Sequence, residues 1–137
     1  MKALIPIVLL SILSGCYKDE VDLAALTTNP FDPGYTGPAF IAVTGESTQQ
    51  VAPNVYNQVL EIVVDHGILQ PAASYKLLVT DLNNDTATEL QQTAPGSNTF
   101  TYTNNSVALG VEYCYTISVL VQFSTTRNEG FCALAEL

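Results

Sequence analysis

"SVALGVEYCYTISV" (residues 106–119) carries the clearest periodic pattern in the chain. In its second half, large apolar residues occupy every second position, namely Tyr113, Tyr115, Ile117 and Val119. Successive side chains of a β-strand point to opposite faces, so this pattern predicts a strand with one face in a core and the other toward solvent.

The same alternation recurs on both sides of this stretch. Further strands are predicted over residues 40–43, 60–65, 75–80, 89–93, 100–102 and 131–135. Turn-forming residues separate the runs, such as Pro53-Asn54, Pro95-Gly96 and Asn104-Asn105. About seven short strands without a convincing helix predict an all-β fold, a single seven-stranded β-sandwich.

Residues 106–119 resemble strand F of a fibronectin type III domain and the approach to it. Gly110 lies three residues before Tyr113, the glycine-to-tyrosine spacing of that family, and Val107 takes the place of its usual leucine. The resemblance implies that Tyr113 buries its ring and that its hydroxyl bonds a backbone group upstream.

The resemblance extends over residues 39–137, and residues 75–79 resemble strand C of the same family. One departure concerns strand B, where the family usually buries a tryptophan. This chain has no Trp, so Val64 or His66 is expected to occupy that region.

The N-terminus has the parts of a secretory signal. Lys2 provides a positive start, and residues 4–13 form an apolar core that is too short to span a bilayer. Leu13-Ser14-Gly15-Cys16 resembles the lipobox of bacterial lipoproteins, which implies removal of the signal peptide 1–15 and lipidation of Cys16. A buried N-terminal helix or strand is the alternative, which Pro6 and the abrupt onset of charge disfavour.

Three charged residues follow the expected lipidation site. Lys18, Asp19 and Glu20 resemble the surface-export signal of some Gram-negative outer-membrane lipoproteins, although a solvated start of a tether would have the same composition. The expected location is therefore the bacterial outer membrane, with a lipid anchor and the domain facing the cell surface.

The region between the lipid and the domain, residues 16–38, is predicted to be a tether. "TTNPFDPGYTGP" (residues 27–38) is rich in Pro and Gly, so we expect it to be extended and semi-rigid rather than packed. Phe31 and Tyr35 either dock on the domain that follows or remain exposed.

The remaining cysteines form an even pair. With Cys16 consumed by lipid, Cys114 and Cys132 are left in an oxidising compartment. The resemblance places them on neighbouring strands F and G and implies a disulfide; two free buried thiols are the alternative. Two thiols and the lone His66 do not make a four-ligand metal set, so neither a metal nor another cofactor is expected.

The acidic composition bounds the partners. The chain has 13 acidic and four basic residues, a formal net charge of −9. A nucleic-acid partner is excluded, because phosphates require a basic surface.

Few residues suggest catalysis. His66 has no serine nucleophile at a supporting spacing, so the protein is not expected to be an enzyme. Asp81-Asn83-Asp85 alternates as in a calcium loop, yet the sixth position is Thr86 rather than Gly, and Asp and Asn also suit turns. Asp85-Thr86-Ala87 resembles a bacterial O-glycosylation acceptor, which marks Thr86 as a candidate modification site.

The sequence thus predicts a lipid-anchored, non-enzymatic module that binds an unknown protein partner or helps assemble an outer-membrane complex. The alternative is a glycan-binding accessory module of an outer-membrane uptake system. Tyr35, Tyr56 and Phe123 would then have to cluster as an aromatic platform, in a chain without Trp.

Overall fold

A computed structural model describes residues 29–70, 74–122 and 124–137. The signal peptide, Cys16, the charged residues Lys18, Asp19 and Glu20, and Phe123 lie outside the described residues. The predictions made for them therefore stay predictions.

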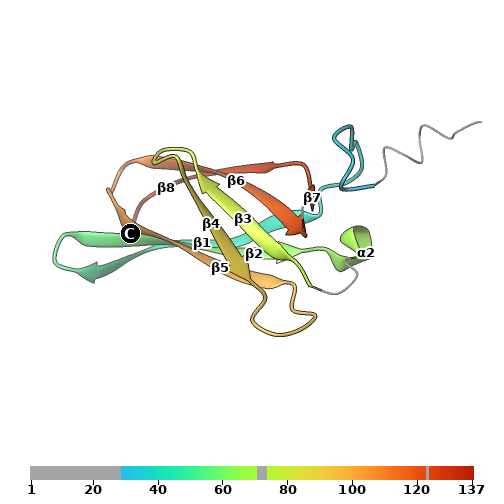
Figure 1. Ribbon diagram of the computed structural model, residues 1–137. Coiled ribbons are helices and arrows are strands. Elements are labelled where there is room, and N and C mark those ends of the chain that lie inside the picture. Colours follow the sequence, from blue (N-terminus) through green and yellow to red (C-terminus); the bar gives the residue numbers. More distant parts are fainter. Residues whose placement is uncertain (1–28, 71–73, 123) are drawn as a thin grey trace, which may run out of the picture.

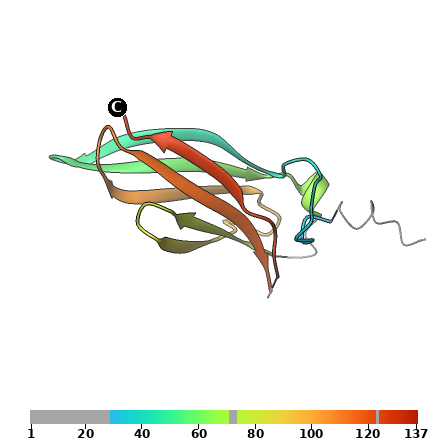
Figure 2. The same cartoon turned by 90° about the horizontal axis from the view of Figure 1, so that it is seen from above.

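The chain forms two antiparallel sheets that face each other (Figures 1 and 2). One sheet has the order β1 (Ile41–Ala52), β2 (Val55–Val64) and β5 (Thr99–Val107). The other has the order β4 (Thr86–Gln91), β3 (Lys76–Asp81) and β6 (Glu112–Val121), with β7 (Ser124–Thr125) and β8 (Glu129–Leu134) both paired to β6. The predicted all-β sandwich is confirmed, and its seven longer strands match the expected number.

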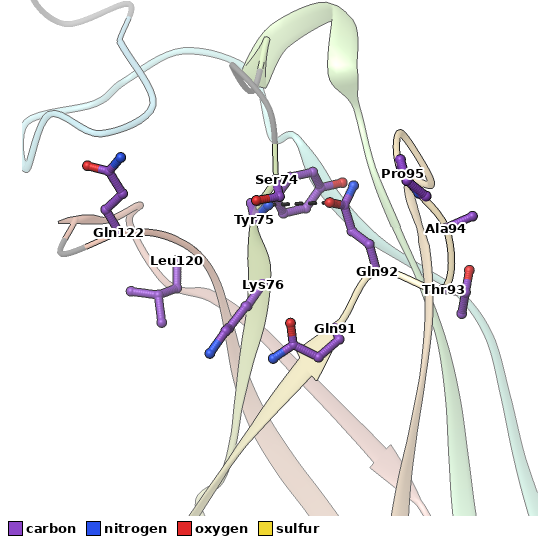
Figure 3. Close-up of a pocket in the computed structure, with 10 residues that line it drawn as sticks. All are labelled: Ser74, Tyr75, Lys76, Gln91, Gln92, Thr93, Ala94, Pro95, Leu120 and Gln122. Atoms are coloured by element: carbon purple, nitrogen blue, oxygen red, sulfur yellow. Dashed lines mark hydrogen bonds between the residues drawn. The ribbon is translucent and has the colours of Figure 1, made fainter.

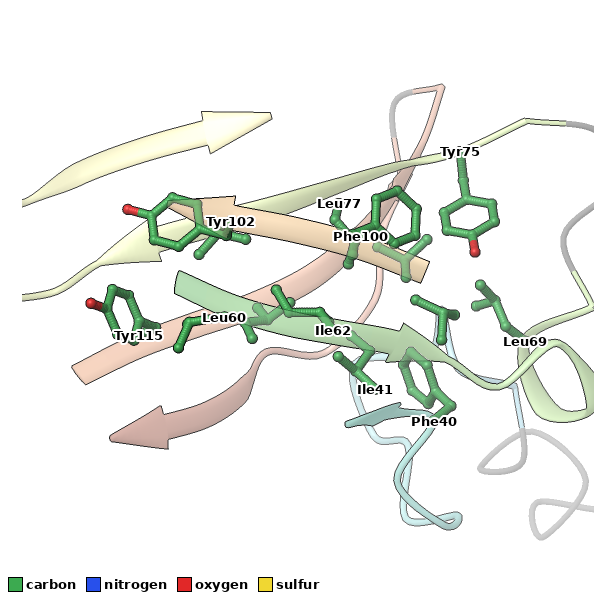
Figure 4. Packing of buried hydrophobic residues seen from close by; sticks show 14 of the residues in the cluster. Phe40, Ile41, Leu60, Ile62, Leu69, Tyr75, Leu77, Phe100, Tyr102 and Tyr115 are labelled. Atoms are coloured by element: carbon green, nitrogen blue, oxygen red, sulfur yellow. The ribbon is translucent and has the colours of Figure 1, made fainter. Parts of the chain in front are cut away.

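The core lies between the sheets and follows the predicted alternation. Leu60 and Ile62 from β2 pack against Leu77 from β3 and the inward side chains of β5 and β6 (Figure 4). Each of these three side chains has no exposed surface. Apolar burial of this kind contributes about 1.5–3 kcal/mol per large side chain and is the main force that joins the two sheets.

Several strands are longer than the sequence predicted, among them β2, which begins at Val55 instead of residue 60. β1 continues past Val43 to Ala52, and register shifts between Val43 and Gly45 and between Gln50 and Ala52 interrupt its alternation. β5 continues through Asn104-Asn105, which were expected to form a turn. In β1 and β5, polar residues extend the strand beyond its apolar core, so a pattern based on hydrophobicity ends too early.

A four-residue helix, α2 (His66–Leu69), follows β2, where the sequence predicted no convincing helix. The side chain of Asp65 caps its start by accepting a hydrogen bond from the Gly67 N–H at 2.8 Å. Gln70 ends the helix in a left-handed conformation with φ of 45°. Of the two residues considered for the region of the missing tryptophan, Val64 is fully buried at the end of β2, and His66 lies in α2.

Of the two outcomes considered for Phe31 and Tyr35, docking is the one that the structure shows, so this part of the predicted tether is packed on the sandwich. Tyr35 is only 4% exposed and stacks edge-on against Phe40, with 5.7 Å between ring centroids. Its hydroxyl donates to the Pro38 carbonyl at 2.7 Å. The Arg127 guanidinium lies 5.1 Å from the centroid of the Tyr35 ring and donates to the Tyr35 carbonyl at 3.0 Å.

The approach to β6 has the features that the resemblance implied. The Tyr113 hydroxyl accepts a hydrogen bond from the backbone N–H of Ala108 at 2.9 Å. Gly110 has φ of 79°, a conformation that a residue with Cβ rarely adopts, and its N–H donates to the Ala135 carbonyl at 2.8 Å.

The disulfide between Cys114 and Cys132 is confirmed, which excludes the alternative of two free thiols. The two cysteines are direct partners in the pairing of β6 with β8, and their Cα atoms are 4.1 Å apart. They alternate with the inward-facing Tyr113 and Tyr115, so the disulfide lies on the outer face of its sheet.

Candidate binding surface

The antiparallel strands sort the turns of the sandwich to two ends. The β1–β2, β3–β4 and β5–β6 turns meet at one end together with residues 135–137, and we call this the distal end (Figure 1). Residues 29–38 and α2 lie at the opposite end, which we call the proximal end. Figure 2 shows the same separation from a second direction.

Exposed apolar side chains gather at the distal end. Within the described residues, all the exposed large hydrophobic side chains lie in the turns of this end or in the strand ends beside them: Val51, Val55, Leu82, Leu109, Val111, Leu134 and Leu137. Single exposed hydrophobics are normal on a protein surface, whereas large contiguous apolar patches are typical of interaction sites.

Backbone and side-chain hydrogen bonds tie these turns to one another. Leu82 N–H donates to the Cys114 carbonyl at 2.9 Å, and the Asn83 amide donates to the Glu112 carbonyl at 2.9 Å. The Gly110 bond to Ala135 joins the β5–β6 turn to the residues after β8. The β3–β4 turn, the β5–β6 turn and the C-terminal residues therefore form a connected surface.

Charge is also distributed unequally between the ends. Asp85, Glu112 and Glu136 are exposed at the distal end. The two basic residues in the described part of the chain, Lys76 and Arg127, lie at the proximal end in ion pairs with Glu89 and Glu129. The distal end thus combines apolar side chains with acidic ones.

A buried carboxylate lies just beneath the distal end. Asp81, the last residue of β3, has no exposed surface. Its Oδ1 accepts from the backbone N–H groups of Asn83 and Asn84 at 2.9 and 3.3 Å, and its Oδ2 accepts from the side-chain amides of Asn84 and Asn104 at 2.6 and 2.8 Å. Four hydrogen bonds compensate for the loss of water around the carboxylate and fix the β3–β4 turn.

Hydrogen bonds continue from Asp81 across the core. Asn104 also donates to the Tyr115 hydroxyl at 3.0 Å, which donates to Gln58 at 2.6 Å, and Gln58 in turn donates to Glu46 at 2.9 Å. Burial raises the pKa of the Tyr115 hydroxyl to about 12, and at neutral pH the protonated hydroxyl donates to Gln58. The network joins β1, β2, β3, β5 and β6, and it fixes the strand ends that carry the distal turns.

The sequence contained an overlooked signal for this network. Gln58, Asp81 and Asn104 each occupy the next alternating position beyond an inward-facing apolar run, namely those ending at Leu60, Val79 and Tyr102. A polar residue in phase with a buried run is a candidate for a buried hydrogen-bonding group.

The calcium-loop interpretation finds no support in the geometry of the β3–β4 turn. Both Asp81 oxygens are bonded to N–H groups, and Asp85 is exposed with φ of 51°. Among the described residues, no group of three or more His, Cys, Asp or Glu side chains could hold a metal ion. Thr86 is exposed as the first residue of the edge strand β4, where an enzyme could reach it.

His66 packs against Tyr75 and has a structural role. Its Nε2 lies 2.7 Å from the Tyr75 hydroxyl, and the two rings pack edge-on with centroids 5.5 Å apart. Burial raises the pKa of Tyr75 to about 12. The histidine is half-buried in α2 and faces Tyr75, the residue before β3.

A shallow cavity of about 450 Å³ lies at the proximal end (Figure 3). Its walls include Lys76, Gln91 and Leu120 on the outer face of the second sheet, Gln122 just after β6, and residues 92–95 of the loop that follows β4. The Gln92 amide is already engaged, because it donates to the Ser97 carbonyl at 2.7 Å. Gln91 and Gln122 place further amide groups at the opening.

The aromatic platform considered for a glycan does not form between Tyr35 and Tyr56. Tyr35 is buried at the proximal end, whereas Tyr56 is half-buried at the start of β2, close to the distal end. Tyr75 lines the proximal cavity, but only 3% of its surface is exposed.

No protein-family model, curated protein or solved structure matches the chain. In residues 29–70, 74–122 and 124–137, no helix has the length and hydropathy of a membrane span.

Proposed function

We propose that this protein is a lipid-anchored, non-enzymatic module on the bacterial outer membrane that binds a protein partner through its distal end. The observation that carries the proposal is the segregation of the exposed apolar side chains. They occupy the end of the sandwich opposite residues 29–38, through which the chain arrives from the expected lipid at Cys16.

The position of the N-terminal segment would determine how the domain is oriented relative to the membrane. A lipid on Cys16 would hold the proximal end toward the membrane, with the charged residues Lys18, Asp19 and Glu20 between the lipid and the domain. The distal end would then be presented away from the membrane, where another protein can reach it. The fibronectin type III-like interpretation agrees with this role, because it supplies a rigid sandwich with binding residues on its turns.

Photo-crosslinking in intact cells tests the proposal. A photoreactive amino acid is placed at Val55 or Leu109 of the distal end, and at Ser74 or Gln91 of the proximal end as matched exposed controls. We expect one discrete crosslinked protein from the distal positions only. The purified partner should bind the native chain and lose affinity when Leu109→Ser is combined with Val111→Ser.

Equal crosslinking from both ends, or unchanged affinity of the double variant, would contradict a distal binding site. Membrane attachment is tested separately with Cys16→Ser, which should abolish palmitate labelling and move the protein to the soluble fraction. A Ser variant that still pellets with membranes and takes up label would contradict the lipid anchor.

A glycan-binding role is a second candidate, which the proximal cavity favours. Side-chain amides both donate and accept hydrogen bonds, as sugar hydroxyls require, and Gln91 and Gln122 supply them at an open cavity. A glycan array probed with the native chain and with Gln91→Ala plus Gln122→Ala distinguishes the two roles. Sugar binding that the double variant loses would favour the glycan role, and no binding to any sugar would oppose it.

A further inference from the structure

The chemistry of the distal end also restricts which proteins it can bind, an inference that rests on the proposed function. We infer that the partner surface has an apolar centre surrounded by Lys or Arg side chains. Two independent features of the described residues carry this inference: the gathered apolar side chains and the sign of the charges among them.

The apolar part provides a centre for the contact. Leu109 and Val111 flank Gly110 in the β5–β6 turn, with 41% and 40% of their surfaces exposed. Leu134, 45% exposed, pairs in register with Glu112 and so lies beside that turn. Leu82, 54% exposed, is joined to the same region through its bond to Cys114. Covering such side chains releases the water around them, which favours association.

The charges around this centre have one sign. Glu112 lies next to Val111, Glu136 lies between Leu134 and Leu137, and Asp85 lies in the same turn as Leu82. In the described part of the chain, both basic side chains are held at the other end. A partner with basic side chains at its rim would be attracted, whereas like charges placed opposite each other would cost binding free energy.

The same charges disfavour other occupants. A second copy would have to bring its own Asp85, Glu112 and Glu136 against those of the first. A membrane surface rich in anionic lipids would meet the same repulsion. A basic-rimmed protein is therefore the occupant that fits both the apolar and the electrostatic character of the distal end.

The surface is also fixed before binding. Asp81 holds the backbone of the β3–β4 turn, and Tyr113 bonds the backbone of Ala108 at the start of the β5–β6 turn. Little conformational entropy would be lost when a partner binds turns that are already held in place. Short peptides of defined chemistry can therefore take the place of the partner as probes in a binding experiment.

Three short amphipathic peptides with the same leucine pattern serve as these probes, carrying lysine, serine or glutamate at every polar position. The mature chain is held in nanodiscs of zwitterionic lipid, with its Leu and Val methyl groups labelled for NMR. We expect the lysine peptide to shift the methyl signals of Val55, Leu109 and Val111, while the signal of Leu120 in the proximal cavity stays in place.

The lysine peptide should bind about tenfold more tightly than the glutamate peptide at low salt. This preference should shrink when salt rises from about 0.05 to about 0.5 M, because exposed charges are then screened. It should also shrink when Asp85→Asn, Glu112→Gln and Glu136→Gln are combined. A control with the same change of charge at other positions, Asp32→Asn, Glu61→Gln and Asp65→Asn, should keep it.

Equal binding of the lysine and glutamate peptides at the distal methyl groups would overturn the basic-rim inference and leave the proposed function intact. Loss of the preference in the control variant instead of the distal variant would also overturn it. Failure of the distal crosslinks described above contradicts the proposed function itself, so the two failures are distinguishable.

Discussion

Asn104 Nδ2 lies 2.8 Å from Oδ2 of Asp81, and this hydrogen bond crosses from one sheet to the other inside the core. The acceptor is a carboxylate without exposed surface, and no basic side chain is among its bonded partners. In the folded state, neutral N–H donors therefore replace the water that would otherwise bond this carboxylate.

Asn104→Ala should destabilise the protein strongly. It removes a charge-assisted bond and leaves part of the Asp81 carboxylate unpaired, which costs about 1–3 kcal/mol or more. Urea unfolding measures the loss. Asn105→Ala is the matched control, because Asn105 is exposed and loses only an exposed bond to Asn57. A similar midpoint for both variants would show that the inter-sheet bond contributes little.

Tyr113→Phe should lower the free energy of unfolding by about 0.5–1.5 kcal/mol. The ring stays buried, but the Ala108 N–H loses its acceptor at 2.9 Å. An unchanged urea midpoint would mean that water replaces the hydroxyl without cost, and that this corner of the fold is not stabilised by the tyrosine.

Reduction of the disulfide should release β8 before the rest of the sandwich unfolds. Among the described strands, β8 pairs only with β6, and the bond between Cys114 and Cys132 closes a loop of 18 residues, worth about 3 kcal/mol in the chain-entropy picture. Hydrogen exchange should show early loss of protection in residues 129–134 after reduction. Uniform loss across both sheets would indicate that the bond stabilises the whole domain instead.

Arg127→Ala should expose residues 29–38 to protease. The guanidinium holds this segment through the ring and the carbonyl of Tyr35, so chymotrypsin should cleave after Phe31 or Tyr35 several-fold faster in the variant. Lys76→Ala removes the other described cation, which is paired only with Glu89, and should leave the cleavage rate unchanged.

Stability should fall between about pH 10 and 12. Burial raises the pKa values of Tyr75 and Tyr115 to about 12, whereas the same groups titrate near 10 in the unfolded chain. In this window the folded state binds more protons than the unfolded state, so the free energy of unfolding decreases as the pH rises. Urea midpoints at several alkaline pH values measure the slope, and Tyr115→Phe should make it shallower. A free-thiol assay controls for damage to the disulfide.

Much of the fold was predictable because its core strands alternate cleanly. Apolar side chains alternate strictly in residues 113–119 of β6, and in residues 75–79, which comprise most of β3 and the residue before it. The prediction of a strand and of its inward face was therefore correct for both segments. β1 was predicted too short because its register shifts break that phase and polar residues line both of its faces.

The candidate site was harder to predict. The sequence marked several turns but could not show that Leu82, Leu109 and Val51 belong to the same end, since that follows from the strand order. Asp81 was considered a turn residue or a metal ligand, because local composition does not reveal an amide from another sheet. Packing of Tyr35 under Arg127 joins residues 92 positions apart and likewise has no local signal.

If Cys16 carries a lipid, the docked segment 29–38 would also limit how far the domain can lie from the membrane. With these residues held on the sandwich, a lipid on Cys16 would be joined to the folded part by 13 residues, which span at most about 45 Å when fully extended. A partner in the same membrane would therefore meet the domain at a high effective concentration, while a partner in free solution would gain no such advantage. Arg127→Ala would lengthen the connection between the lipid and the folded domain. It should therefore weaken binding to a partner in the same membrane without altering the distal end itself.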